Sequence, residues 1–275
     1  MEKTGLMYKK FFDEYVSEDA VRKYTTETAG YGITHLLRSD YARIYLDVVD
    51  SYLRPLAARP LRLLEFGCGA AMNITRLVSL FDEKKVPVEY AIGTDFSPRL
   101  VQAAGEEAKT FLPSHLAGKL SFHVARNEQL VQDLAAELGR GEDQIGPFDL
   151  VVGVNTSRYC HRLGKELDCA KDIYRLLRSG GVCINIDMNN RFPAFRSRLR
   201  GSDPSRDECY LPSLEEYASP FKAAGFEIIT KKNFCWIPHS AGYGLTLACR
   251  GMSPFLNLVA RSRAMRSLVV ARKPA

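Results

Sequence analysis

Short apolar runs alternate with helical patterns through most of this chain. Each run is four to six residues long and largely apolar, which is typical of strands buried on both faces of a sheet. The longer segments between the runs repeat apolar residues at helical spacing. This alternation predicts an α/β fold, with strands at about 61–66, 90–93, 120–124, 148–153, 182–187, 226–230 and 267–272.

Helix boundaries can be read at several points between these strands. Ser97 as N-cap and Pro98 at the first helical position predict a helix start. Ser213 has capping-box spacing and predicts another, with an interruption at Pro220. Further helices are expected at about 71–80 and 163–177, the second ended by glycines at 180 and 181.

The turn after the first strand brings acid and glycine residues together. Glu65 stands near the end of that strand, and Gly67 and Gly69 follow it. Glycine permits unusual dihedrals and lets a ligand lie against bare backbone, and open α/β sheets bind ligands at the carboxyl ends of their strands. A dinucleotide fingerprint needs a third small residue where Met72 stands, so the turn fits NAD poorly.

A second acid, Asp95, ends the next strand. An acid in this place can accept hydrogen bonds from the hydroxyl groups of a ribose. Together, Glu65, the Gly-x-Gly turn and Asp95 resemble the motifs of class I S-adenosylmethionine-dependent methyltransferases of the small-molecule type. The resemblance covers roughly residues 56–190.

The resemblance implies a Rossmann-like, seven-stranded, mostly parallel sheet with helices on both faces and the last strand antiparallel between the fifth and sixth. It implies S-adenosyl-L-methionine as the cofactor and S-adenosyl-L-homocysteine as its product. Glu65 would meet the amino group of the methionine part, Asp95 the ribose and Phe96 the adenine ring. The expected cofactor-binding residues are Glu65, Gly67, Cys68, Gly69, Asn73, Asp95, Phe96, Arg126, Asn127 and Asn155.

Two of these positions lie where the sequence departs from the family. An Asp usually follows the third strand and contacts the adenine amino group, but Arg126 stands there with Asn127 beside it. The side-chain amide of Asn127 can still hydrogen-bond the adenine edge. Asn155 follows the fourth strand, where residues of this family commonly lie beside the sulfonium methyl group.

Two regions outside the motifs are expected to cover the crevice. Residues 1–55 form either a helical lid over cofactor and substrate or a helical collar around a loop at 24–35. The methyltransferase domain then occupies 56–275, with substrate-cap segments at about 188–212 and 233–266; the second could equally be an ordinary packing insert before the last strand. The expected substrate-binding residues are Tyr24, Tyr31, Arg191, Arg196, Trp236 and Tyr243.

The first cap segment is rich in arginine. Four arginines fall between Arg191 and Arg200. They indicate either a solvated helix face or a rim that binds phosphate or carboxylate groups, since the guanidinium fork suits such anions. RNA is a weaker alternative, because no recognised RNA-binding module accompanies the patch.

Methyl transfer from a sulfonium is an in-line displacement in which the protein supplies alignment, desolvation and sometimes a base. Histidine is the usual base for an O- or N-nucleophile. His161, after the fourth strand, and His239, in the second cap segment, are candidates, with Tyr159 a weaker one. A lone histidine is often structural, and an activated carbon or a ready amine needs no base.

Composition narrows the cofactors and partners. The net charge of +6 permits an anionic substrate without requiring nucleic acid. No apolar run approaches a membrane span, and residues 1–4 do not begin like a signal peptide. The seven cysteines are scattered without a Cys-x-x-Cys pair, so no metal site is expected. We expect a cytoplasmic protein that does not bind membranes; whether it forms a homodimer stays open.

The expected function is S-adenosylmethionine-dependent methyl transfer to an anionic or aromatic small molecule of natural-product or secondary metabolism. One alternative is an RNA or protein methyltransferase that uses the Arg191–Arg200 patch, which salt-sensitive RNA binding would indicate. A second is a protein of this fold that binds the cofactor without methyl transfer.

Overall fold

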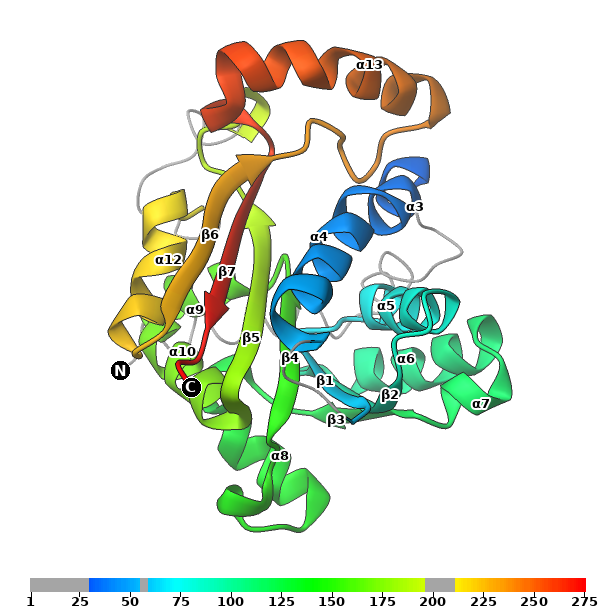
Figure 1. Ribbon diagram of the computed structural model, residues 1–275, viewed down its shortest axis with the longest axis vertical. Coiled ribbons are helices and arrows are strands. Elements are labelled where there is room, and N and C mark those ends of the chain that lie inside the picture. Colours follow the sequence, from blue (N-terminus) through cyan, green and yellow to red (C-terminus); the bar gives the residue numbers. More distant parts are fainter. Residues whose placement is uncertain (1–29, 55–58, 196–210) are drawn as a thin grey trace.

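The computed structural model describes residues 30–54, 59–195 and 211–275, which form one twisted sheet between two layers of helices (Figure 1). The strand order is β3-β2-β1-β4-β5-β7-β6. All neighbours are parallel except β7, which runs antiparallel to both β5 and β6. The expected seven-stranded sheet is therefore confirmed. Its strands are β1 Leu61–Phe66, β2 Val88–Asp95, β3 Leu120–Val124, β4 Phe148–Val154, β5 Leu177–Met188, β6 Glu227–Phe234 and β7 Arg266–Arg272.

The helices of the described residues lie mostly between the strands, and two of them begin at the N-caps that the sequence predicts. The N-cap hydroxyl of Ser97 accepts a hydrogen bond from the Leu100 amide, and Ser213 forms the expected capping box with Glu216. The helices are α3 Tyr31–Arg38, α4 Asp40–Val48, the π-helical turn Val49–Leu53, α5 Met72–Glu83, α6 Pro98–Phe111, α7 Ser114–Ala117, α8 Leu130–Leu138, α9 Ser157–Leu163, α10 Glu166–Leu176, α12 Leu214–Ala223 and α13 Tyr243–Ala260; short 3-10 turns cover Asn127–Gln129, Glu142–Gln144 and Arg261–Arg263.

Two apolar cores lie on opposite faces of the sheet, because successive strand residues point to opposite sides. One core joins side chains such as Leu63, Leu150 and Val270 to α3, α4 and α5. The other joins Leu64 and Val151 to α8, α10 and α12. The helices before β1 thus share a core with the sheet, which holds them beside the carboxyl ends of the strands.

Several sequence-based boundaries were wrong. Gly180 and Gly181 lie inside β5, which begins directly after α10. The helix expected at 163–177 is α10 and begins only at Glu166, because Gly164, with a left-handed φ of 64°, ends the preceding helix α9, which was not expected. Pro220 lies within α12 and does not interrupt it. Residues 31–35, expected in a loop, begin α3.

The antiparallel β7 brings a late part of the chain to the crevice edge of the sheet. Its first residue, Arg266, pairs with Met188 at the end of β5 and with Phe234 at the end of β6. Between β6 and β7, α13 crosses that same edge above the strand ends (Figure 1). Seven of the ten exposed large hydrophobic side chains among the described residues lie on α13.

No helix in the part of the chain that the structure describes is both long enough and apolar enough to span a membrane. The same residues contain no cluster of His, Cys, Asp and Glu that could hold a metal ion.

Candidate active site

The turn between β1 and α5 is built on glycines in left-handed conformation. Gly67 has a φ of 60° and Gly69 a φ of 55°. A Cβ atom on Gly67 would lie 1.9 Å from the Thr156 hydroxyl oxygen, whereas a Cβ on Gly69 would meet nothing within 4 Å. Gly67 is therefore required by close packing against the segment after β4, while Gly69 leaves its backbone open to a ligand.

Glu65 lies beneath this turn at the head of a buried polar chain. The amide of Asn73 donates to its Oε1 at 2.8 Å, and the Tyr45 hydroxyl donates to the Asn73 oxygen at 2.7 Å. Burial raises the pKa of Glu65 to about 8, against the lowering effect of its hydrogen bond from Asn73. Its Oε2 is buried and has no hydrogen-bond partner among the described residues.

Asp95, at the end of β2, closes the other side of the turn. Its two oxygens accept hydrogen bonds from the backbone amides of Gly69 and Ser97, each at 3.0 Å. Burial raises the pKa of Asp95 to about 6, while these backbone hydrogen bonds lower it. The same carboxylate that a ribose would meet thus fixes the glycine turn and the start of α6.

The corner after β3 separates the two adenine candidates. The Arg126 guanidinium is held by both oxygens of Asp133 at 2.8 Å. The Asn127 amide instead donates to the Thr156 hydroxyl at 2.8 Å and faces the glycine turn. Phe96 packs with Tyr159 against Ala70 and Leu100. Asn127 is therefore the better-placed of the two, and both remain predictions.

The donor set of this half fits S-adenosylmethionine. Two buried carboxyl groups, one with an unpaired oxygen, lie beside a turn whose backbone is open. The cofactor carries an ammonium group and a sulfonium, which are cations that a carboxylate can pair with. It also carries two ribose hydroxyls, which can donate hydrogen bonds to a carboxylate. Glu65 would hold the ammonium group and Asp95 the ribose. Cys68 lines the turn with its thiol buried against the Gly69 carbonyl, at 3.5 Å.

Asn155 marks the end of β4 and the second half of the site. It takes a left-handed φ of 57°, which asparagine tolerates better than most residues. Its side-chain oxygen accepts from the Arg266 Nη1 at 3.0 Å, and its backbone carbonyl accepts from Arg158. A single residue therefore lies between two arginines.

The two arginines differ in their partners. Arg158 forms a buried ion pair with Asp187, with 3.0 Å between Nη1 and Oδ1, and its Nη2 donates to the Tyr159 hydroxyl at 2.7 Å. Asp187, which is fully buried, also accepts from the Ser157 hydroxyl at 3.1 Å. Arg266 is 1% exposed and bonds to Asn155.

The candidate bases lie in different surroundings. The His239 Nε2 is 3.2 Å from the hydroxyl of Tyr41, which belongs to α4 and is fully buried. Burial lowers the pKa of His239 well below its usual value, and the charges of Arg266 and Arg158 lower it further. His161 lies edge-on to the Tyr217 ring, with 5.4 Å between ring centroids, on the α12 side of the sheet. His239 is thus next to the arginines, whereas His161 packs into the opposite layer.

The ring of Tyr159 makes cation–π contacts with two arginines. The Arg158 and Arg162 guanidinium carbons lie 4.4 and 5.2 Å from its ring centroid. These contacts suit a residue that orients Arg158 more than one that accepts a proton.

The expected substrate contacts divide into three groups. Tyr31 and Tyr243 meet edge-on, with centroids 5.1 Å apart, where α3 lies against the start of α13. The Trp236 indole donates to Asn257 of α13 at 2.9 Å, and Arg191 is exposed. Tyr24 and Arg196 lie outside the described residues, as do most of residues 188–212 and the first 29 residues.

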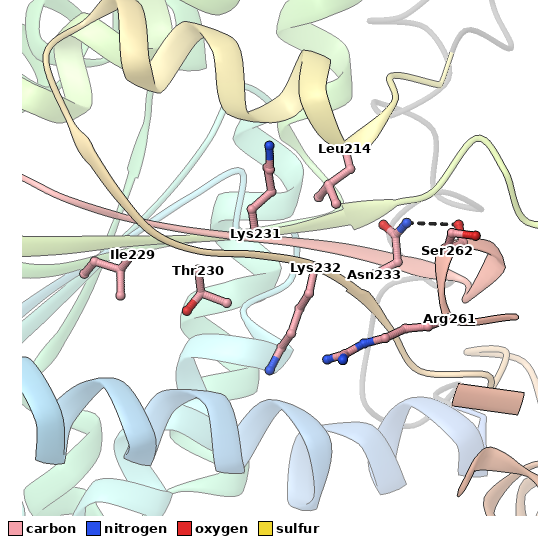
Figure 2. Close-up of a pocket in the computed structure, with 8 residues that line it drawn as sticks. All are labelled: Leu214, Ile229, Thr230, Lys231, Lys232, Asn233, Arg261 and Ser262. Atoms are coloured by element: carbon pink, nitrogen blue, oxygen red, sulfur yellow. Dashed lines mark hydrogen bonds between the residues drawn. The ribbon is translucent and has the colours of Figure 1, made fainter. Parts of the chain in front are cut away.

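A hollow of about 560 Å³ lies elsewhere, along the edge strand β6. It is lined by Leu214, Ile229, Thr230, Lys231, Lys232, Asn233, Arg261 and Ser262, with a hydrogen bond from Asn233 to Ser262 (Figure 2). Two strands, β5 and β7, separate β6 from β4 in the sheet. None of the expected site residues lines this hollow.

Sequence reasoning missed four residues that shape the site: Tyr41, Tyr45, Asp187 and Arg266. Asp187 and Arg266 carried a usable signal, since each is a charged residue at the crevice end of an apolar strand. The two tyrosines repeat at helical spacing with apolar residues, so the sequence pattern showed only that they would be buried.

A protein-family model described as a methyltransferase domain matches residues 37–231 of the chain. Among curated proteins, the non-reducing polyketide synthase tazA of Aspergillus terreus is 27% identical over 165 residues. That match covers 59% of this chain and 6% of the synthase, so the chain corresponds to a small part of a much longer relative.

Solved structures share the fold at low identity. The CMeT domain of the citrinin polyketide synthase superposes with a TM-score of 0.60 at 15% identity, covering 96% of this chain and 59% of that one. The geranyl diphosphate C-methyltransferase of Streptomyces coelicolor A3(2) has a TM-score of 0.55 at 14% identity, covering 94% and 85%. At these identities the likeness shows the fold alone.

Proposed function

Because this chain belongs to the methyltransferase-domain family and is a class I S-adenosylmethionine-dependent methyltransferase, we propose that it methylates a carbon atom of a small organic acceptor. The names of its relatives support this proposal. One is a polyketide synthase, and one similar structure is a C-methyltransferase with a small diphosphate as its named ligand. The exposed Arg191, which is the one arginine of the Arg191–Arg200 segment among the described residues, gives an RNA or protein acceptor weaker support.

The His239 imidazole carries the proposal, since its Nε2 lies 3.2 Å from the Tyr41 hydroxyl and its ring is within reach of the Arg266 and Arg158 charges. A carbon nucleophile must lose a proton before or while it attacks, and a base that is unprotonated at neutral pH can accept that proton. The low pKa of His239 keeps its ring in this state. If the Nε2 hydrogen is donated to the Tyr41 oxygen, the Nδ1 lone pair is left for the acceptor.

The proposed division of labour follows from the two halves of the crevice. When bound, the cofactor supplies an electrophilic methyl group. Glu65 and Asp95 bind and orient it, and Asn127 contacts the adenine edge. Asn155, between the arginines, lies where the acceptor approaches. His239 would accept the proton that the acceptor carbon loses as the methyl group passes to that carbon from the sulfonium.

The test has two stages. Calorimetric titration with S-adenosylhomocysteine should show binding that Asp95→Ala weakens by about 100-fold. Isotope-labelled S-adenosylmethionine is then offered with 2,4-pentanedione, phenol or aniline, and the products are identified by NMR. Methylation at the central carbon of the diketone supports the proposal. Cofactor binding with methylation of phenol or aniline alone would overturn it.

A further inference from the structure

Arg266 is the largest fully buried side chain in the described part of the protein. Only its Nη1 has an acceptor there, the amide oxygen of Asn155 at 3.0 Å. Its Nε is buried without any hydrogen-bond partner among the same residues. A buried charge without an opposite charge is costly, so an uncompensated guanidinium at this position needs a physical explanation.

The surroundings of Arg266 do not supply that charge. The fully buried Asp187 is engaged by Arg158, Ser157 and the Met188 amide. Burial raises the pKa of Tyr41 above its usual value and that of Cys235 to about 12, so both stay neutral near pH 7. Asp40 lies at the partly exposed start of α4. Its charge raises the pKa of Tyr41 and of Cys235, and it forms no ion pair with Arg266.

We propose that Arg266 is the counter-ion for a carboxylate group on the methyl acceptor, with Asn155 holding the guanidinium in place. This rests on the proposed function, and it narrows the substrate from any small carbon acid to an anionic one. Asn155 follows the end of β4 and Arg266 begins β7, with β5 between these strands, so both residues stand at the edge of the sheet where the parallel strands end.

The chemistry favours a carboxylate over a single anionic atom. Arginine binds carboxylates through two parallel N–H groups. Because Nη1 donates its hydrogen bond to Asn155, the edge of the guanidinium formed by Nε and Nη2 is the one that has no acceptor among the described residues. That edge offers two parallel donors in one plane. A ligand carboxylate there would also satisfy the orphaned Nε.

Binding of such an acceptor would prepare the base. The positive charge of Arg266 lowers the pKa of His239, and a carboxylate paired with Arg266 would cancel that effect. The imidazole would then become a stronger base only when the acceptor is present. This coupling gives a readout that does not depend on turnover.

The experiment uses the full chain saturated with S-adenosylhomocysteine. Acetoacetate and its neutral counterpart acetoacetamide are compared at equal concentration and ionic strength by thermal unfolding. We expect acetoacetate to raise the Tm by about 3 °C at ten times its Kd, and acetoacetamide to have no effect. Acetoacetate should also raise the pKa of His239, measured by NMR titration of its ring protons.

Three variants separate the interpretations. Arg266→Met and Asn155→Asp should both lose the response to acetoacetate, the second because it supplies an internal carboxylate. Arg272→Met removes a partly exposed arginine, paired with Glu227, from the other end of β7 and should keep the response.

A wild-type protein that binds S-adenosylhomocysteine but ignores acetoacetate overturns the inference and leaves the proposed function standing. Loss of S-adenosylhomocysteine affinity in Arg266→Met would also overturn it, since Arg266 would then hold the cofactor's own carboxylate. Failure of the wild type to bind S-adenosylhomocysteine would instead contradict the proposed function.

Discussion

The two halves of the crevice differ in the ionisable groups that they bury. On the β1 and β2 side, Glu65 and Asp95 are carboxyl groups set around an open glycine turn. On the β4, β5 and β7 side, Arg158 and Arg266 are buried guanidinium groups with Asp187 as their one buried acid. A sulfonium and ammonium cofactor suits the first half, and an anionic acceptor suits the second. The comparison shows that one edge of a sheet can bury carboxyl groups on one side and guanidinium groups on the other, which underlies the proposed choice of two reactants.

The halves also differ in how completely their charges are satisfied. Each oxygen of Asp95 accepts a hydrogen bond from a backbone amide, and Arg158 forms an ion pair with Asp187. Glu65 and Arg266 each retain one buried atom without a partner among the described residues. Those two atoms, one acidic and one cationic, mark where a ligand would complete each half.

The largest effect is expected from breaking the buried ion pair between Arg158 and Asp187, which belongs to the β4, β5 and β7 side of the crevice, here called the arginine half. Asp187→Asn removes the acid while Arg158 stays buried, and an uncompensated charge of this kind destabilises by about 3–5 kcal/mol. Urea unfolding followed by circular dichroism measures the loss. Asp133→Asn, which breaks a more exposed pair with Arg126, is the control and should cost about 1 kcal/mol or less. Equal losses in the two variants would contradict the distinction.

Replacement of the proposed base should affect turnover and spare cofactor binding. His239→Gln is expected to lower kcat by about 100-fold, because a positioned base typically contributes 10²–10⁴-fold, with S-adenosylhomocysteine affinity unchanged. His161→Gln, on the α12 side, should retain turnover. Full activity of the His239 variant, or loss of activity only in the His161 variant, would reverse the assignment.

The acidic half is tested at the ribose position. Asp95→Ala should weaken S-adenosylhomocysteine binding by about 100-fold, because the two charge-assisted hydrogen bonds that the ribose hydroxyls would donate to Asp95 are lost. Calorimetry gives the affinity, and circular dichroism verifies that the turn has not unfolded. Glu89→Ala, an exposed acid on the same strand, is the matched control. An Asp95 variant that binds with wild-type affinity would remove the ribose assignment.

The last prediction concerns pH. Because the pKa of Glu65 is raised to about 8 in the folded protein, its contribution to stability is present below pH 4.5 and is lost as pH rises toward 8. Glu65→Gln should flatten that dependence by about 4 kcal/mol, measured as unfolding free energy without cofactor between pH 5 and 9. An unchanged slope in the variant would show that Glu65 is ionised throughout.

The sequence was a good guide to the sheet and a partial guide to the site. Buried parallel strands read as apolar runs, and Ser97, Pro98 and Ser213 fix helix starts through local hydrogen bonds, so these features follow from near neighbours in the chain. The acid half was predicted for the same reason: Glu65, Gly67 and Gly69 are adjacent, and Asp95 ends the next strand.

The arginine half depends on contacts that no local pattern contains. Arg266 reaches Asn155 across 111 positions of sequence, and Tyr41 reaches His239 across 198. Such pairs exist only because β7 inserts beside β5 and α4 packs over the strand ends. Gly180 and Gly181 misled for a related reason, since pairing of β5 with β4 and β7 overrides their usual role as helix stops.

The connection between β6 and β7 has a consequence for how this protein could be re-engineered. Phe234 and Arg266 face each other across the ladder, and the Met265 amide donates to the Cys235 carbonyl at 2.8 Å, so the segment leaves and re-enters the sheet at one point. Residues 243–260, which form α13 and follow His239, are therefore the part of this connection that can be replaced while His239 and the backbone contacts of residues 239 and 241 with α3 are kept. Grafting a helix of another length there would change what covers the strand ends without shifting the strand register that holds Glu65 and Asp95.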